Sequence, residues 1–229
     1  MTKAELIEIV GKDVFEAASE DLRLEAADPA YGGVLSSPRL PASDLPHRIA
    51  DLIWDSPDSW ADKIRLLFDV YDEMPGYGHL MYVTHHYEHF SASDRLLWWH
   101  EVAERLETAV PAIANPIEYS LWCDFFEDPD RVTEAWGHLT QDNPSESVVR
   151  VVLRASGPVP YAMKRPLYEQ LITDPKWHEW ILESLRASAS DVYGDIDRMD
   201  ARTWLDRLLV SEPGQVVEIK ALLDRPSSS

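Results

Sequence analysis

Residues 115–139 read NPIEYSLWCDFFEDPDRVTEAWGHL, and this stretch contains the signals from which the fold class follows. Two dipeptides in it, Asn115-Pro116 and Asp128-Pro129, place a polar side chain directly before proline. Such a side chain can accept a hydrogen bond from an unpaired amide of the first helical turn, and proline suits the first helical position because its missing N–H costs nothing there. The two dipeptides therefore predict two helix starts.

The same signals recur along the chain. Further polar residues stand before proline at Ser56-Pro57, Asn143-Pro144 and Asp174-Pro175. A glutamate at the third helical position would complete a capping box for Asn115 with Glu118, Asn143 with Glu146 and Thr2 with Glu5. Apolar residues then follow at helical spacing in four stripes: Trp60, Ile64, Leu67, Phe68 and Tyr71; Trp99, Val102, Ala103, Leu106 and Val110; Val132, Ala135, Trp136 and Leu139; and Trp177, Trp180, Ile181 and Leu185. Strand-like alternation is absent, so the sequence predicts an all-α protein.

Helix beginnings recur at a regular interval in the middle of the chain. Asp58, Asp94 and Asp130 follow one another at intervals of 36 residues, and each is expected to enter the first turn of a helix that carries Trp and Leu. This interval is the size of one antiparallel helix pair, and stacked pairs form α-solenoids. Residues 56–156 therefore resemble a HEAT-type helical repeat, with looser pairs at 161–190 and 200–224. The resemblance implies a short α-solenoid, and an irregular compact helical bundle is the alternative.

Length and composition are consistent with one all-helical domain over residues 1–229. The 45% hydrophobic content and nine tryptophans are sufficient for a core. We expect an extended Pro-, Gly- and Ser-rich loop at 28–46, after a first helix over about 3–26, and a frayed tail at 225–229. Cys123 is the single cysteine, no secretory signal pattern begins the chain, and the apolar runs are too short to span a bilayer. A cytoplasmic protein without membrane contact is expected.

The negative charge is concentrated in one part of the chain. Residues 51–150 hold 20 Asp or Glu against 6 Lys or Arg, whereas residues 151–229 hold 12 against 10. Such a field repels nucleic acid and anionic membranes and attracts basic partners. Direct binding to nucleic acid is therefore not expected, even though Arg154, Lys164, Arg165, Lys176 and Arg186 offer a modest basic strip.

The densest acidic cluster lies between residues 118 and 134. It is interleaved with aromatic residues, and Tyr or Trp beside a charged rim is typical of protein-binding hot spots. An alternative is that Asp128 caps a helix, that Asp130 and Glu134 favour its positive end, and that the aromatic side chains belong to the core. The predicted interaction residues are Glu118, Trp122, Asp124, Glu127, Asp128, Asp130 and Glu134.

Two other clusters could hold a metal ion. His85 and His89 are four residues apart, as two zinc ligands on one helical face would be, with His86 between them. A zincin motif has Glu directly after its first His, however, and here that position is His86. We therefore interpret this face as polar surface and keep a metal-dependent enzyme centred on these histidines as the alternative function.

The second cluster is Asp69, Asp72 and Glu73. Its spacing resembles the aspartate-rich magnesium site of helical prenyl-chain enzymes, but the second ligand cluster that those enzymes need is missing from the sequence. We interpret these three residues as a solvated helix face.

No complete catalytic set occurs in the sequence, so it favours a binding protein over an enzyme and predicts no cofactor. The leading hypothesis is a cytoplasmic module that neutralises or escorts a basic protein. An immunity protein against a toxin such as a basic nuclease is one form of this hypothesis, and a nucleic-acid mimic that inhibits a DNA-binding protein is another.

Overall fold

The structure is a computed structural model that describes residues 1–27, 44–81, 83–141, 143–189, 198–208 and 213–224. All regular structure in these ranges is helical, which confirms the prediction of an all-α protein. None of the helices within them is long and apolar enough to cross a membrane. Most of the expected loop at 28–46 and the whole expected tail at 225–229 lie outside the described residues, and the chain is already helical from Asp44.

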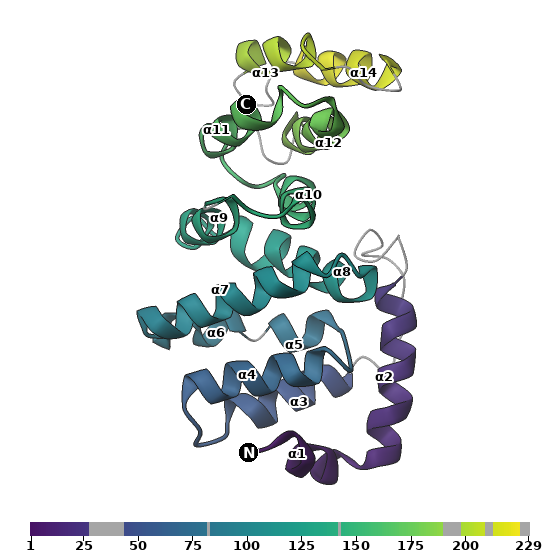
Figure 1. The fold of residues 1–229 in the computed structure, drawn as a ribbon, viewed down its shortest axis with the longest axis vertical. Coiled ribbons are helices and arrows are strands. Elements are labelled where there is room, and N and C mark those ends of the chain that lie inside the picture. Colours follow the sequence, from purple (N-terminus) through teal and green to yellow (C-terminus); the bar gives the residue numbers. More distant parts are fainter. Residues whose placement is uncertain (28–43, 82, 142, 190–197, 209–212, 225–229) are drawn as a thin grey trace. The chain divides into compact units, whose positions relative to one another are not determined.

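The chain divides into two compact units, Met1–Ser120 and Leu121–Ser229, and each is described by itself. The first unit runs from purple to teal in Figure 1. Its α-helices are α1 (Lys3–Val10), α2 (Lys12–Ala26), α3 (Asp44–Trp54), α4 (Trp60–Tyr71), α5 (Tyr77–Met81), α6 (Val83–His86), α7 (Ala92–Glu107) and α8 (Pro111–Ser120), with a 3-10 turn at Tyr87–His89.

Helices α3, α4 and α5 pack together in the first unit, while α7 covers α4, and α8 contacts α2, α5 and α7. The apolar stripe predicted for residues 60–71 forms the centre of this core: Ile64, Leu67 and Phe68 have no exposed surface. Burying an aliphatic side chain of this size is worth about 1.5–3 kcal/mol. Phe68 packs against Trp98 of α7, with ring centroids 5.0 Å apart, so the stripe contributes to the packing between α4 and α7.

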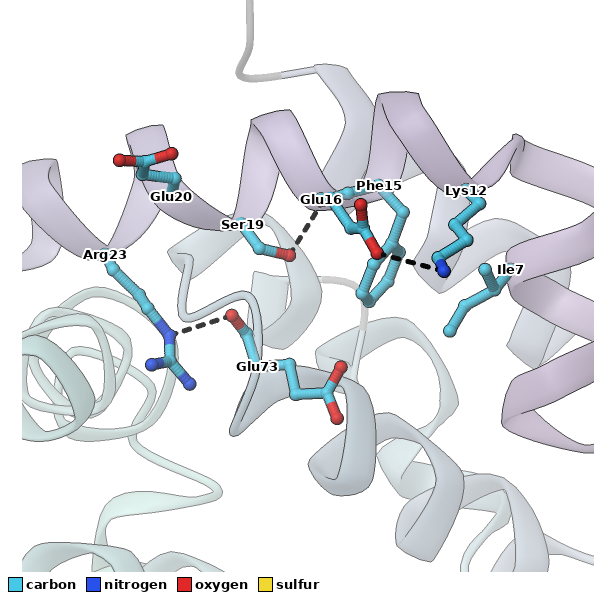
Figure 2. Close-up of a pocket in the computed structure, with 8 residues that line it drawn as sticks. All are labelled: Ile7, Lys12, Phe15, Glu16, Ser19, Glu20, Arg23 and Glu73. Atoms are coloured by element: carbon cyan, nitrogen blue, oxygen red, sulfur yellow. Dashed lines mark hydrogen bonds and ion pairs between the residues drawn. The ribbon is translucent and has the colours of Figure 1, made fainter.

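The expected first helix over about 3–26 is two helices. Gly11 separates α1 from α2 with φ of 95° and ψ of 123°, a backbone conformation that residues other than glycine rarely adopt. The chain therefore turns a corner at Gly11, and α1 and α2 enclose a hollow beside the turn that follows α4 (Figure 2).

The second unit begins with a π-helical turn, Leu121–Phe126. It continues with α9 (Val132–Thr140), α10 (Glu146–Ala155), α11 (Tyr161–Leu171), a 3-10 turn at Pro175–Trp177, α12 (His178–Ala189), α13 (Arg198–Leu205) and α14 (Pro213–Leu223). Helix α12 contacts α10 and α14, while α10 also contacts α9, and α13 contacts α14. The Val-rich segment 148–153 lies in α10, with Val152 and Leu153 fully buried.

A hydrogen-bonded polar network lies inside the second unit. Ser184 of α12 bonds both the Tyr168 hydroxyl and the Ser156 hydroxyl at 2.6 Å. Lys164 of α11 donates to the Ser156 carbonyl at 3.0 Å and to the Ser188 hydroxyl. Burial raises the pKa of Tyr168, so this phenol stays protonated at neutral pH. The network joins the end of α10 to α11 and α12 through satisfied buried polar groups.

The predicted helix caps are partly wrong. Thr2 with Glu5 forms the expected capping box, and Asp174 accepts from Lys176 N at 3.1 Å. Asn115 and Pro116, however, lie inside α8, where Asn115 Nδ2 donates to Ala26 O at 2.9 Å. At the other expected starts a serine or another residue downstream of the proline is the N-cap: Ser59 for α4, Arg131 for α9 and Ser145 for α10.

The three aspartates spaced by 36 residues do not occupy equivalent positions. Asp94 is the third residue of α7 and forms a capping box with Ser91. Asp58 and Asp130, in contrast, each lie two residues before the first residue of the helix that follows, α4 or α9. The equal spacing therefore reports similar segment lengths, not a repeated capping role.

Candidate functional site

The acidic and aromatic segment lies on an unusual helical turn. Glu127 N donates to Trp122 O at 3.3 Å, a bond that spans five residues and belongs to the π-helical turn Leu121–Phe126. Turns of this kind are rare and occur frequently at functional sites. Here the turn leaves Trp122 37% exposed, while Phe125 and Phe126 are buried in the core. The segment therefore presents one aromatic side chain to solvent rather than several.

Arg131 organises the carboxylates that follow this turn. Its Nε lies 3.3 Å from Asp128 Oδ2, and its Nη1 donates to the Asp124 carbonyl at 3.4 Å. Asp128 Oδ1 also accepts from Asp130 N at 2.9 Å, so Asp128 shapes the loop before α9. Glu127 and Asp130 are exposed on the same loop. Asp128 is thus structural, whereas Glu127 and Asp130 are exposed and follow Trp122 closely in the chain.

The remaining predicted interaction residues lie at either side of this loop. Asp124 is half-buried within the π-helical turn, and Glu134 is half-buried in the first turn of α9. A carboxylate in that first turn is stabilised by the positive end of the helix. Glu118 lies in α8, at the end of the first unit, so the cluster within the second unit extends from Trp122 to Glu134.

The histidines at 85–89 do not lie on one continuous α-helix. Helix α6 ends at His86, and Tyr87–His89 is a 3-10 turn, so the four-residue spacing of His85 and His89 is not the geometry of one α-helical face. Within the described residues, no group of three or more His, Cys, Asp or Glu side chains is arranged to hold a metal ion.

His86 belongs to an aromatic cluster. Its ring centroid lies 5.3 Å from that of Trp54 and 5.5 Å from that of Trp60. Buried Lys63 donates to the Trp54 carbonyl at 2.6 Å, with its Nζ 4.5 Å from the centroid of the Trp60 ring. Burial, followed by the nearby Lys63 charge, lowers the pKa of His86. This imidazole therefore stays neutral and packs as an aromatic ring at neutral pH.

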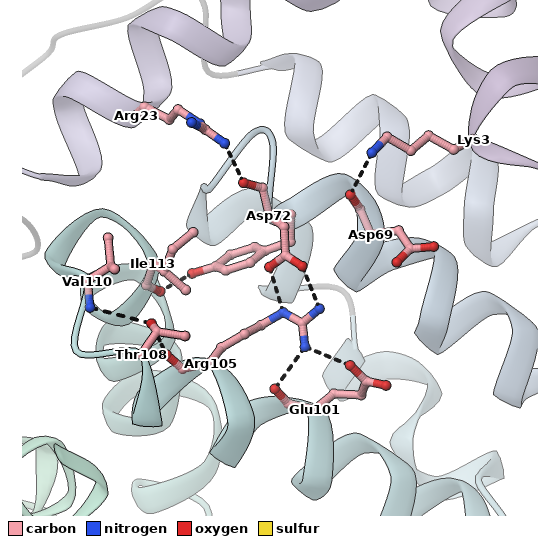
Figure 3. Close-up of polar contacts among 10 residues, drawn as sticks. Lys3, Arg23, Asp69, Asp72, Glu101, Arg105, Thr108, Val110 and Ile113 are labelled. Carbon is pink, nitrogen blue, oxygen red and sulfur yellow. Dashed lines mark hydrogen bonds and ion pairs between the residues drawn. The ribbon is translucent and has the colours of Figure 1, made fainter.

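Basic side chains contact the cluster of Asp69, Asp72 and Glu73, and Figure 3 shows those at Asp69 and Asp72. Arg105 binds both carboxylate oxygens of Asp72 at 2.8 Å, and Lys3 pairs with Glu73 and donates to the Asp69 carbonyl at 3.1 Å. Asp72 and Glu73 are both exposed, as predicted for a solvated helix face, but each also forms an ion pair. These carboxylates fasten α4 to α7 and α1.

The predicted basic strip is partly neutralised. Lys164 is fully buried in the polar network. Arg165 pairs with Glu169 at 3.1 Å, and Lys176 pairs with Glu146 at 3.0 Å, which raises the pKa of Lys176. Arg165 and Lys176 are thus paired with carboxylates, which reduces the net positive charge of the strip.

Comparisons of the chain with protein-family models, curated proteins and solved structures give no match.

A hollow in the first unit was missed at the sequence level. It has a volume of about 460 Å³ and lies between α1, α2 and the turn after α4. The signal that could have found it is Gly11, because a glycine between two apolar helical patterns indicates a change of direction.

Proposed function

We propose that the chain is an acidic protein-binding module that neutralises or escorts a basic protein. The observation that carries this proposal is the exposure of Trp122 on a π-helical turn beside the exposed carboxylates of Glu127 and Asp130. A tryptophan anchor next to charged groups has the composition of a binding hot spot. Exposed carboxylates would guide a basic partner to this anchor and accelerate association.

Two forms of this function use the same surface. In the first, the module is an immunity protein that occupies the phosphate-binding surface of a basic toxin such as a nuclease. In the second, its carboxylates imitate the phosphates of nucleic acid and inhibit a DNA-binding protein. Both forms require an acidic surface, and its contribution to binding affinity weakens as salt screens the charges.

We further propose a HEAT-like stacking of helix pairs as the scaffold for this surface. Its support comes from the second unit, where α12 contacts both α10 and α14, and where α10 and α14 also contact their sequence neighbours α9 and α13. Contact between every second helix is what stacked antiparallel pairs produce. An irregular helical bundle is the alternative architecture.

The binding proposal is tested by affinity capture from the native host, followed by a binding titration with the captured protein. We expect a basic partner that is released more readily as salt is raised. The Trp122→Ala variant should weaken binding by roughly 30-fold, as the loss of about 2 kcal/mol at a hot spot predicts. A second variant, Glu127→Lys with Asp130→Lys, should weaken it further and reduce the salt dependence.

A matched control separates the proposed surface from overall charge. Glu104 and Glu107 are exposed on α7, so Glu104→Lys with Glu107→Lys makes the same change in net charge in the other unit. This control should retain most of the affinity. A partner that binds both double variants equally, or that tolerates Trp122→Ala without loss, would rule out the proposed surface.

A further inference from the structure

The hollow between α1, α2 and the turn after α4 has the form of a small-molecule site. Its volume of about 460 Å³ lies in the range of ligand pockets. Ile7 of α1 and Phe15 of α2 are its apolar lining residues (Figure 2); Ile7 is partly exposed, whereas Phe15 is only 3% exposed and presents little more than its edge. The remaining lining residues are Lys12, Glu16, Ser19, Glu20, Arg23 and Glu73.

One wall of the hollow is held in place by hydrogen bonds. Arg23 Nε donates to the Glu73 carbonyl at 3.0 Å, and its Nη2 donates to the Asp72 carbonyl at 2.7 Å. The Glu73 carboxylate is paired with Lys3. Arg23 therefore joins α2 to the end of α4, and Glu73 is paired with Lys3. Neither residue offers an unpaired charge to a ligand.

The α2 side of the hollow carries the charges that remain available. Glu16 and Glu20 stand one helical turn apart on α2. The pair between Lys12 and Glu16 is long at 3.5 Å, and both side chains are more than half exposed, so it contributes little. Glu20 makes no ion pair or hydrogen bond with any described residue. Because Lys12 balances Glu16, the Glu20 carboxylate leaves a net negative charge on this edge, which favours a cation over an anion. The net charge of −20 acts in the same direction.

We infer that this hollow binds an organic cation with an aromatic or branched apolar body. The apolar body lies mainly against Ile7 and reaches the exposed edge of Phe15, and the ammonium group lies at the Glu16 and Glu20 carboxylates. The cation is either a free amine or a lysine side chain next to an apolar residue in a peptide. This site lies in the first unit and does not depend on the protein-binding surface proposed for the second.

The test uses three probes of one shape and different charge: phenethylammonium, phenethyl alcohol and phenylacetate. Binding is followed by amide chemical shifts of the isotope-labelled full chain. Phenethylammonium should shift the amides of α2 around Phe15 to Glu20 with a Kd on the order of 1 mM, as a fragment of this size allows. The alcohol should bind several-fold more weakly, and phenylacetate should not shift these amides.

Substitutions test which residues form the binding site. Glu20→Gln should weaken phenethylammonium about fivefold, whereas Glu25→Gln makes the same charge change on an exposed part of α2 outside the hollow and should leave binding unchanged. Ser19→Phe should fill the hollow and abolish binding while the helical content stays native. An acetylated and amidated Phe-Lys dipeptide that binds more tightly than phenethylammonium would identify a peptide as the source of the cation. Equal binding of all three probes, absence of binding at about 10 mM, or an unchanged affinity in Glu20→Gln would overturn the inference.

Discussion

Arg105 of α7 donates two parallel hydrogen bonds to the carboxylate of Asp72, from Nε to Oδ1 and from Nη2 to Oδ2, each 2.8 Å long (Figure 3). The third guanidinium nitrogen donates to Glu101 Oε2 at 2.6 Å, and the guanidinium carbon lies 4.5 Å from the centroid of the Phe68 ring. Arg105 is only 8% exposed, so this ion-pair network fixes the end of α4 against α7 in a partly desolvated setting.

Removal of this guanidinium should destabilise the first unit. In Arg105→Ala the carboxylates of Asp72 and Glu101 lose their common partner, and Phe68 loses a packed neighbour. We expect the free energy of unfolding in urea to fall by roughly 2 kcal/mol, since Asp72 is half exposed and water replaces part of the loss. The matched variant Arg65→Ala breaks an exposed pair with Asp62 at 3.6 Å and should cost less than about 0.5 kcal/mol. Equal losses in the two variants would contradict a special role for Arg105.

His79 should make the protein less stable in mild acid. Its side chain is fully buried, neither ring nitrogen makes a hydrogen bond of good geometry, and burial lowers its pKa from 6.5 to about 3. The Met74 backbone opposes this shift, while the neighbouring His47 adds to it. The unfolded chain therefore binds one more proton than the folded chain between about pH 6.5 and pH 3. Stability is retained above pH 6.5 and falls as the pH drops through this window, with a slope approaching about 1.4 kcal/mol per pH unit.

The His79 effect is measured by urea unfolding between pH 7 and pH 5, a range chosen to lie above the ordinary carboxylate pKa values. His79→Leu should flatten this dependence. Because the pKa of His86 is also lowered, the free energy of unfolding of this variant should still fall with decreasing pH, but less steeply. A pH profile unchanged by His79→Leu would show that another group titrates.

The buried network of the second unit predicts a cost for losing one hydroxyl. Ser184→Ala leaves both the Tyr168 hydroxyl and the Ser156 hydroxyl without the partner that each has at 2.6 Å. We expect a loss of about 1–3 kcal/mol in the free energy of unfolding, because buried donors left unsatisfied keep their desolvation penalty. Ser147→Ala, at a half-buried position of α10, is the control and should change stability by less than about 0.5 kcal/mol. A similar result for the two serines would contradict the importance of the network.

Helix type was predictable from the sequence, whereas several helix starts and the contacts between helices were not. The stripe Val132, Ala135, Trp136 and Leu139 lies buried on one face of α9, because periodicity reports burial directly. Several predicted helix starts were misplaced because a proline lies two or three residues before the true first residue of the helix and was taken for it. Competing serines, Ser59 with Asp62 and Ser145 with Val148, provide the observed caps instead.

The candidate sites depended on three-dimensional contacts that the sequence does not encode locally. The clustering of Trp122 with acidic residues was readable, but the sequence left open whether Phe125 and Phe126 are exposed or belong to the core, because the π-helical turn shifts the face on which each residue lies. Lys164 looked like surface charge, since its partners Ser156 and Ser188 belong to two other helices. The hollow could have been predicted only if the change of chain direction at Gly11 had been recognised.

Gly11 should tolerate no side chain, because its φ of 95° with ψ of 123° lies outside the regions open to L-residues. Space is not the limit: the nearest atom to an added Cβ is Val14 Cγ2 at 3.8 Å. Gly11→Ala should therefore lower the free energy of unfolding by about 1–3 kcal/mol through backbone strain alone. It should also weaken phenethylammonium binding, since the corner that forms the hollow must relax.

The same substitution at Gly214 should have the opposite effect on stability. It lies in the first turn of α14, and nothing approaches an added Cβ within 4 Å. Gly214→Ala should raise stability by about 0.4–1 kcal/mol, because alanine has less backbone freedom to lose on folding. Thermal and urea unfolding of both variants measure the contrast. A Gly11→Ala protein as stable as the wild type would mean that α1 and α2 can join without the positive φ, and the hollow between them would then lose its structural basis.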